Sequence, residues 1–175
     1  MRAYYFDELP GDQRLPHDSA REVPPEVLKA IHVQALNIPL EGYEQAVTQY
    51  ATDKGYQNHD VISMSKEGLG EAYEAKSKMF FAEHLHEDDE ARYIIEGSGY
   101  FDLREQSDAW IRVAVVPGDL LIVPAGIYHR FTLDTHDYVK AMRLFKDAPK
   151  WEAIYRGEQS DNHPVRKAYL ESTSL

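Results

Sequence analysis

The chain has 175 residues, of which 43% are hydrophobic and 28% charged, and this composition is typical of one globular domain with a buried core. Its formal net charge of -11 disfavours contact with phosphate backbones and anionic lipids, so we expect neither nucleic acid nor membrane as a partner. The chain contains no cysteine, which excludes disulfides, thiolate metal sites and cysteine nucleophiles. Any metal ion must therefore be held by histidine and carboxylate side chains.

The N-terminal third is predicted to hold a short strand, a loop and two helices. Residues 2–6 fit an edge strand, and residues 9–25, which are rich in Pro, Asp and Gly, are predicted to be a loop. Pro24 and Pro25 open a helix, because proline suits the first helical turn. A second helix is predicted over residues 42–53.

The rest of the chain changes from helical to β patterning. Residues 60–64 predict a strand, and the apolar spacing is then helical from Glu67 to about Phe81. Further strands are predicted at residues 92–96, 100–104, 110–116, 120–123, 127–133 and 138–145. Gly97-Ser98-Gly99 is interpreted as a hairpin turn between the first two of these strands. Short strands separated by Gly and Pro favour an antiparallel barrel or sandwich, and a short helix is predicted near residues 164–171.

Two histidines two positions apart predict a metal site. His84 and His86 point to the same face of a strand, so both imidazoles can reach one ion about 2 Å from each ring nitrogen. Glu90 follows four residues after His86, where a tight turn can bring its carboxylate to the same ion. A fourth ligand can come from His129, on a distant strand just after a Pro-x-Gly corner.

Each of these residues also has a plain structural interpretation. The chain has eight histidines, so one His-x-His pair can arise by chance. The acidic run at residues 87–90 can be a solvated turn, and His129 can be a core histidine with satisfied hydrogen bonds. The joint spacing of the four residues distinguishes a metal site from these structural interpretations.

That joint spacing resembles the two sequence motifs of the cupin family. The first motif, His-x-His, three residues, Glu, six residues, Gly, is matched by His84, His86, Glu90 and Gly97. The second motif, Gly, five residues, Pro-x-Gly, two residues, His, is matched by Gly118, Pro124, Gly126 and His129. The chain departs from the pattern at Lys78 and Leu133, where the family has turn-forming glycine and asparagine rather than ligands. The resemblance implies a mainly β, jelly-roll type cupin barrel with two or three flanking helices.

Within the cupins, the chain is most similar to the acireductone dioxygenase family. Residues 84–104, 124–134 and 140–145 and Trp151 carry this resemblance. It implies a single cupin domain over the whole chain. The expected barrel core covers about residues 60–155, with N-terminal helices within 24–54 and a short C-terminal tail.

The resemblance to acireductone dioxygenases also implies a cofactor, a substrate and a location. One Fe(II) per chain, or Ni(II) in its place, is expected at the three histidines and Glu90. The substrates are acireductone, 1,2-dihydroxy-3-keto-5-methylthiopentene, which is a late intermediate of methionine salvage, and O2. Ni(II) binds such ligands more tightly than Fe(II), so cellular availability decides between them, and we expect Fe(II). The N-terminal segment turns acidic too early for a secretory signal, so we expect a cytoplasmic protein, with a nuclear pool as a further expectation. We also expect the protein to be a monomer.

Cationic and aromatic side chains are predicted around the metal site. Arg92 shares the strand face of Glu90, and the resemblance places Arg92 and Arg143 near the anionic substrate. The alternative is that each arginine pairs with a surface carboxylate, and Arg104 and Arg112 are interpreted as surface residues. Phe80, Phe131 and Trp151 match family positions that wall the pocket and hold the methylthio tail, with core packing as the alternative.

Two rival functions share the same four ligands. The first is another cupin enzyme, such as a sugar-phosphate isomerase, which would turn over without consuming O2. The second is a non-catalytic cupin that binds metal without turnover. Fold alone cannot separate these functions. The two arginines and the aromatic wall favour the dioxygenase.

Overall fold

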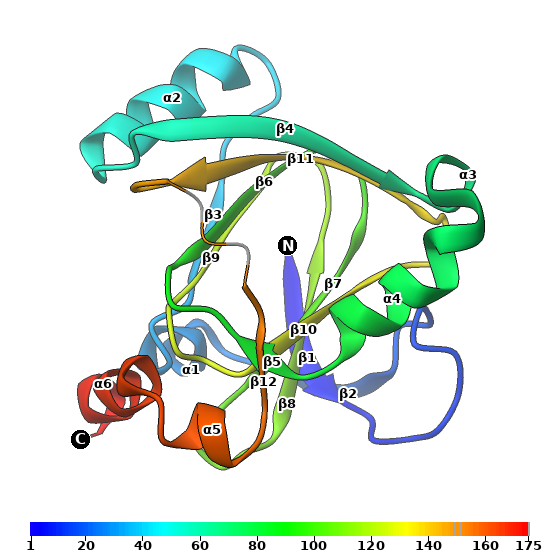
Figure 1. The fold of residues 1–175 in the computed structure, drawn as a ribbon. Coiled ribbons are helices and arrows are strands. Elements are labelled where there is room, and N and C mark those ends of the chain that lie inside the picture. The colour runs from blue at the N-terminus through cyan, green and yellow to red at the C-terminus, as the bar shows by residue number, and fades with distance from the viewer. Residues whose placement is uncertain (149, 151, 175) are drawn as a thin grey trace.

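Two antiparallel sheets face one another in the computed structural model, which describes residues 1–148, 150 and 152–174 (Figure 1). The five-stranded sheet has the order β3 (Gln34–Asn37), β9 (Asp119–Val123), β6 (Glu90–Gly97), β11 (Tyr138–Phe145) and β4 (Asn58–Ser65). The seven-stranded sheet has the order β12 (Ile154–Tyr155), β5 (His84–Leu85), β10 (His129–Leu133), β7 (Gly99–Arg104), β8 (Trp110–Val115), β1 (Arg2–Phe6) and β2 (Asp18–Glu22). The protein is thus mainly β, with the cupin architecture that the sequence predicted.

The helices lie around this barrel. They are α1 (Pro25–Ala30), α2 (Tyr43–Asp53), α3 (Lys66–Leu69), η1 (Gly70–Ala72), α4 (Tyr73–Phe81), α5 (Glu158–Asp161) and α6 (Pro164–Thr173). Helix α2 lies over the outer face of the five-stranded sheet (Figure 1), where Val47 and Ala51 pack with Tyr93 and Leu120. None of the helices in the described part of the chain is long and apolar enough to span a membrane.

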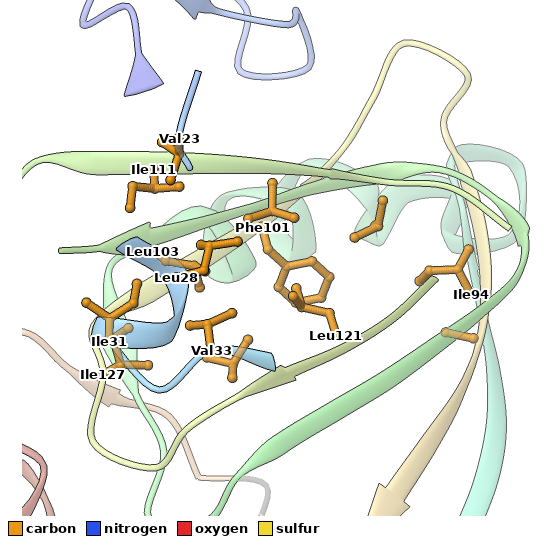
Figure 2. Packing of buried hydrophobic residues seen from close by; sticks show 14 of the residues in the cluster. Val23, Leu28, Ile31, Val33, Ile94, Phe101, Leu103, Ile111, Leu121 and Ile127 are labelled. Atoms are coloured by element: carbon orange, nitrogen blue, oxygen red, sulfur yellow. The ribbon is translucent and has the colours of Figure 1, made fainter. Parts of the chain in front are cut away.

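The main core fills the space between the two sheets. Ile94 and Leu121 reach it from the five-stranded sheet, and Phe101, Leu103 and Ile111 reach it from the seven-stranded sheet (Figure 2). Strand residues alternate between the two faces of a sheet, so every second residue of these strands enters the core. Each fully buried side chain of this size contributes about 1.5–3 kcal/mol of transfer free energy.

The strand predictions are confirmed for most of the barrel, but the N-terminal segment differs. The predicted loop over residues 9–25 contains β2, which pairs with β1. Strand β1 is consequently not an edge strand, because β2 and β8 lie on its two sides. The sequence analysis also did not predict β3, β12 or α5.

Two local predictions in the middle of the chain are wrong. The helix expected from Glu67 to Phe81 is broken into α3, η1 and α4, and the break lies at Gly70, whose φ is +53°. The segment Gly97-Ser98-Gly99 is not a hairpin turn, because β6 pairs with β9 and β11 while β7 pairs with β8 and β10. It is the crossing from one sheet to the other.

The crossing requires glycine at position 97. Gly97 has a φ of +74°, and a Cβ there would overlap the backbone carbonyl of Tyr138. We expect Gly97→Ala to lower the free energy of unfolding by about 2 kcal/mol or more, since left-handed strain and a backbone clash add together. Urea unfolding measures this loss. The matched control is Gly55→Ala, at φ +80° with open space around it, which should cost only about 1 kcal/mol. Equal losses in both variants would contradict the clash.

A buried ion cluster on the outer face of the seven-stranded sheet corrects the interpretation of Arg112 as a surface residue. The side chains of Arg112 and Asp102 are both 0% exposed, and Asp102 accepts from Arg112 Nε at 2.7 Å and Nη2 at 2.9 Å. Arg130 Nε also donates to Asp102, at 2.8 Å. Arg112 is covered by the segment before β2, since its Nη1 donates to the carbonyls of Gln13 and Leu15.

Arg104 is likewise not a freely solvated residue. Its side chain is 20% exposed and donates to both carboxylate oxygens of Glu83, at 2.9 and 3.0 Å. Its guanidinium also lies over the ring of Trp110, 3.7 Å from the centroid. Arg104 therefore joins the chain just before β5 to the seven-stranded sheet.

Candidate metal centre

Three histidines on, or directly after, two neighbouring strands of the seven-stranded sheet converge. His84 on β5 and His129 on β10 are register partners, and His86 directly follows β5. The ring centroids lie 4.5 Å apart for His84 and His129, 4.9 Å for His84 and His86, and 5.3 Å for His86 and His129. One nitrogen of each ring lies within 4.8 Å of the others. The structure therefore brings together the three histidines that the sequence analysis selected.

The outward-facing nitrogen of each histidine is bonded to the backbone. The Nδ1 atoms of His84, His86 and His129 lie 2.7, 2.9 and 3.0 Å from the carbonyl oxygens of Ala82, Glu152 and Ile127. A carbonyl can only accept, so each Nδ1 donates its hydrogen and leaves a lone pair on Nε2. This arrangement is the usual support of metal-bound histidine, because it fixes both the tautomer and the ring orientation.

Glu90 faces two of these lone pairs. Its Oε2 lies 2.9 Å from His129 Nε2 and 3.5 Å from His86 Nε2. Two acceptors this close require a cation between them, either a proton on the imidazole or a metal ion. Two ligands at right angles, each about 2.1 Å from an ion, are about 3 Å apart, so these separations suit a shared metal ion. The donor set of imidazole nitrogen and carboxylate oxygen fits a borderline divalent ion such as Fe(II) or Ni(II).

The protonation of these groups favours metal binding at neutral pH. Burial, together with the neighbouring charge of His129, lowers the pKa of His84 to about 4. Burial also lowers the pKa of His86. For Glu90, burial alone would raise the pKa, but the charge of Arg92 and the contacts with His129 outweigh it and hold the pKa well below its ordinary value. Neutral imidazoles and an ionised carboxylate are the forms that bind metal.

The low pKa of His84 predicts acid sensitivity of the metal-free protein. An unfolded histidine has a pKa of about 6.5, so the unfolded chain binds more protons than the folded one between that pH and about pH 4. Stability therefore falls as the pH falls through this window, by about 2 kcal/mol at pH 5 for this group. Urea unfolding of chelator-treated protein at pH 7.5 and 5.0 measures the loss. His84→Gln should show a shallower pH dependence, and an unchanged dependence would refute the assignment.

A cavity of about 330 Å³ opens beside the three histidines, between the two sheets. Apolar side chains form most of its wall, and Arg92 and Arg143 are its cationic members. Arg92 Nη2 lies 3.3 Å from Glu90 Oε1. Arg143 donates to Asp60, so it has a carboxylate partner, as in the alternative considered for it, while still lining the cavity. Both predicted arginines are thus at the site.

Two of the three aromatic residues that were predicted to wall the substrate pocket line this cavity. Phe80 and Phe131 line the cavity, and Phe131 also packs against Phe101, with ring centroids 4.9 Å apart. Trp151 lies outside the described residues. Tyr155, which was not predicted from the sequence, also lines the cavity, and its ring centroid is 6.2 Å from that of His84. No local pattern marked it, because β12 is only two residues long.

Asp89 is the second residue near the metal centre that the sequence analysis missed. The acidic run was interpreted as a solvated loop, but Asp89 Oδ1 accepts from the backbone N–H of Ala125 at 3.0 Å. The backbone N–H of Gly126 donates to the carbonyl of His86 at 3.0 Å. These two contacts join the turn between His86 and Glu90 to the Pro-x-Gly corner that leads to His129.

Comparisons with known proteins agree with this geometry. A model of the ARD/ARD′ family matches residues 2–153. The chain is 55% identical to "Acireductone dioxygenase 1" of Coprinopsis cinerea, over 100% of this chain and 99% of that protein. It is 51% identical to "Acireductone dioxygenase" of Phaeosphaeria nodorum, over 98% of this chain and 96% of that protein.

A solved structure shares the fold. It is "Acireductone dioxygenase from Bacillus anthracis with cadmium ion in active center", with a TM-score of 0.68, 25% identity and coverage of 78% of this chain and 94% of that one. The family model and the full-length likenesses to named dioxygenases lead to one assignment. The chain is an oxygenase that belongs to the acireductone dioxygenase family.

Proposed function

We propose that this protein catalyses the reaction of acireductone with O2, using one divalent metal ion per chain held by His84, His86, Glu90 and His129. The observation that carries the proposal is the convergence of three Nε2 lone pairs, each fixed by a backbone hydrogen bond at Nδ1, beside a cavity with two arginines. The names of the full-length relatives support the same substrate.

The bound ion would supply Lewis acidity, which favours loss of a proton from the enediol and so makes the substrate more reactive toward O2. The chain itself supplies charge and shape. Arg92 and Arg143 bind the anionic enediolate, because their guanidinium groups are the cationic members of a mainly apolar wall. Glu90 balances the charge of Arg92 at 3.3 Å.

The apolar part of the cavity suits the other end of the substrate. Phe80, Phe131, Ile62 and Met64 line it. Aromatic and thioether side chains make favourable contacts with sulfur, so this wall is well suited to a methylthio tail. Filling the cavity would also exclude water from the reacting atoms, which strengthens the electrostatic contacts made by the arginines.

The ion decides the products in our proposal. With Fe(II), acireductone and O2 give 4-methylthio-2-oxobutanoate and formate. With Ni(II), they give 3-methylthiopropanoate, formate and carbon monoxide. We propose Fe(II) as the native ion and methionine salvage as the pathway. The proposal includes a monomer that works in the cytoplasm, with a nuclear pool.

The test is O2 uptake by the anaerobically Fe(II)-loaded protein when acireductone is added, with formate quantified in the same sample. We expect equal amounts of O2 consumed and formate formed, and carbon monoxide only after Fe(II) is replaced by Ni(II). Turnover of a substrate without O2 uptake would favour the isomerase alternative. Metal binding without any turnover would favour the non-catalytic alternative, and either result would refute the proposed reaction.

A further inference from the structure

A carboxylate outside the proposed ligand set forms a bidentate ion pair with one of the cavity arginines. Asp60 on β4 is the register partner of Arg143 on β11, and Arg143 is in turn the register partner of Arg92 on β6. The Asp60 carboxylate accepts Nε–H of Arg143 at 2.8 Å and Nη2–H at 2.5 Å. A guanidinium held through two parallel N–H groups is fixed in position and in plane.

The ion pair between Asp60 and Arg143 is important because two positively charged side chains lie side by side. Arg92 and Arg143 both line the cavity, and repulsion between them opposes keeping both there. Each arginine also has a carboxylate partner, which is Glu90 for Arg92 and Asp60 for Arg143. The two positive charges of Arg92 and Arg143 therefore lie between the two negative charges of Glu90 and Asp60.

The exposure of the pair argues against a mainly structural role. The Asp60 side chain is 42% exposed and the Arg143 side chain is 16% exposed. Ion pairs this open to solvent contribute little to stability. The hydrogen bonds from Arg143 lower the pKa of the Asp60 carboxyl against the opposing effect of partial burial, so Asp60 is charged at neutral pH.

We propose that Asp60 is a positioning residue for the reaction. It holds the guanidinium of Arg143 at the cavity wall, beside Arg92, so that Arg143 binds the anionic part of the substrate. This inference rests on the proposed function for the identity of that substrate. Asp60 acts through Arg143 rather than on the reacting atoms.

The direction in which Asp60→Asn changes the KM for acireductone distinguishes a positioning role from a simple effect of charge. Removing a negative charge near an anion-binding cavity removes a repulsion, so charge alone would lower the KM for acireductone. Loss of the bidentate ion pair instead lets Arg143 move away from the like charge of Arg92, which raises KM. We expect KM to rise about tenfold with kcat changed by less than about twofold, and Tm to stay within about 2 °C.

Two further variants complete the kinetic test. Asp60→Glu keeps the charge and both acceptor oxygens, so it should restore most of the affinity lost in Asp60→Asn. The matched control is Asp18→Asn, which removes an aspartate that pairs with Arg2 far from the cavity, on the exposed edge strand β2. Its KM and kcat should equal those of the wild type.

A spectroscopic measurement tests whether Asp60 holds the guanidinium of Arg143, and it requires no turnover. In the metal-free protein, the Nε–H of Arg143 should give a resolved ¹H–¹⁵N NMR signal that exchanges slowly with water. Asp60→Asn should broaden or remove this signal, and Asp60→Glu should retain it. Arg143→Lys identifies the signal by its loss.

Each outcome decides the proposal. A raised KM with an altered Arg143 signal supports positioning. An unchanged or lowered KM, or an Arg143 signal that survives Asp60→Asn, overturns it. If the wild-type protein does not react with acireductone, the proposed function fails, whereas the NMR measurement still shows whether Asp60 holds Arg143. The two failures are therefore distinguishable.

Discussion

His129→Gln is expected to abolish stable metal binding and to lower the rate of O2 consumption about a thousandfold or more. His129 is 2% exposed, and its Nε2 is the nitrogen nearest to Glu90, at 2.9 Å. This contact joins the two sheets, because His129 lies on β10 of the seven-stranded sheet while Glu90 begins β6 of the five-stranded sheet. A glutamine fills similar space but cannot place a lone pair at the same point, so two histidines and a carboxylate would remain.

Metal content by mass spectrometry and O2 uptake measure these losses in the same preparation. The matched control is His59→Gln, which changes an exposed histidine on β4 that is not a member of the cluster of His84, His86 and His129. It should keep one ion per chain and wild-type activity. A His129→Gln protein that retains both a full complement of metal and its activity would exclude His129 as a ligand.

Metal removal offers a second readout of the same site. An ion that binds only the folded chain raises its stability by RT ln(1 + [L]/Kd), which is about 4 kcal/mol at a thousand times Kd. Chelation should therefore lower the Tm of the wild-type protein, and re-addition of Fe(II) or Ni(II) should restore it. The Tm of His129→Gln should respond to neither treatment, whereas loss of a merely structural histidine would leave the response intact.

Arg112→Met is expected to lower the free energy of unfolding by about 3–5 kcal/mol, because the buried carboxylate of Asp102 loses its ion pair with Arg112. The side chain of Asp102 is 0% exposed, and among the described residues it would keep only the side-chain hydrogen bond from Arg130, at 2.8 Å. The carbonyls of Gln13 and Leu15 would lose their donor as well. Methionine fills part of the volume but satisfies none of these acceptors.

Urea unfolding measures the loss, and hydrogen exchange should show faster exchange in the segment between β1 and β2. The control is Arg2→Met, whose guanidinium side chain is 52% exposed and pairs with Asp18 and Glu22. It should lower the free energy of unfolding much less than Arg112→Met does, because exposed ion pairs contribute little to stability. A loss below about 1 kcal/mol in Arg112→Met would contradict the role assigned to the buried cluster.

Local pattern was enough to predict the strands that form the barrel and the residues that could bind metal. Strand periodicity depends on neighbouring residues only, so β4 and β6 to β11 could be predicted from the order of apolar and polar residues. His84 and His86 share a face because side chains repeat every two residues along a strand. The joint spacing with Glu90 and His129 then selected these residues from the eight histidines of the chain.

Strand partners, by contrast, were decided by the tertiary structure. The glycines around Ser98 are as suitable for a sheet crossing as for a hairpin turn, because both require tight backbone conformations. Whether β6 pairs with β7 depends on which sheet can bury each strand, and here the two strands lie in different sheets. The loop predicted before residue 25 became β2 for the same reason, since β1 offered it an open edge.

The sequence by itself was enough to predict the fold class, the candidate metal ligands and the arginines beside them, because the residue types and their joint spacing resemble those of a known family. Only the tertiary structure decided which charged groups are buried and which carboxylate holds which arginine. Arg112 is buried because a segment nearly a hundred residues away covers it, and Asp60 meets Arg143 across a separation of 83 residues. Such contacts arise when the strands assemble, so no local pattern in the chain contains them.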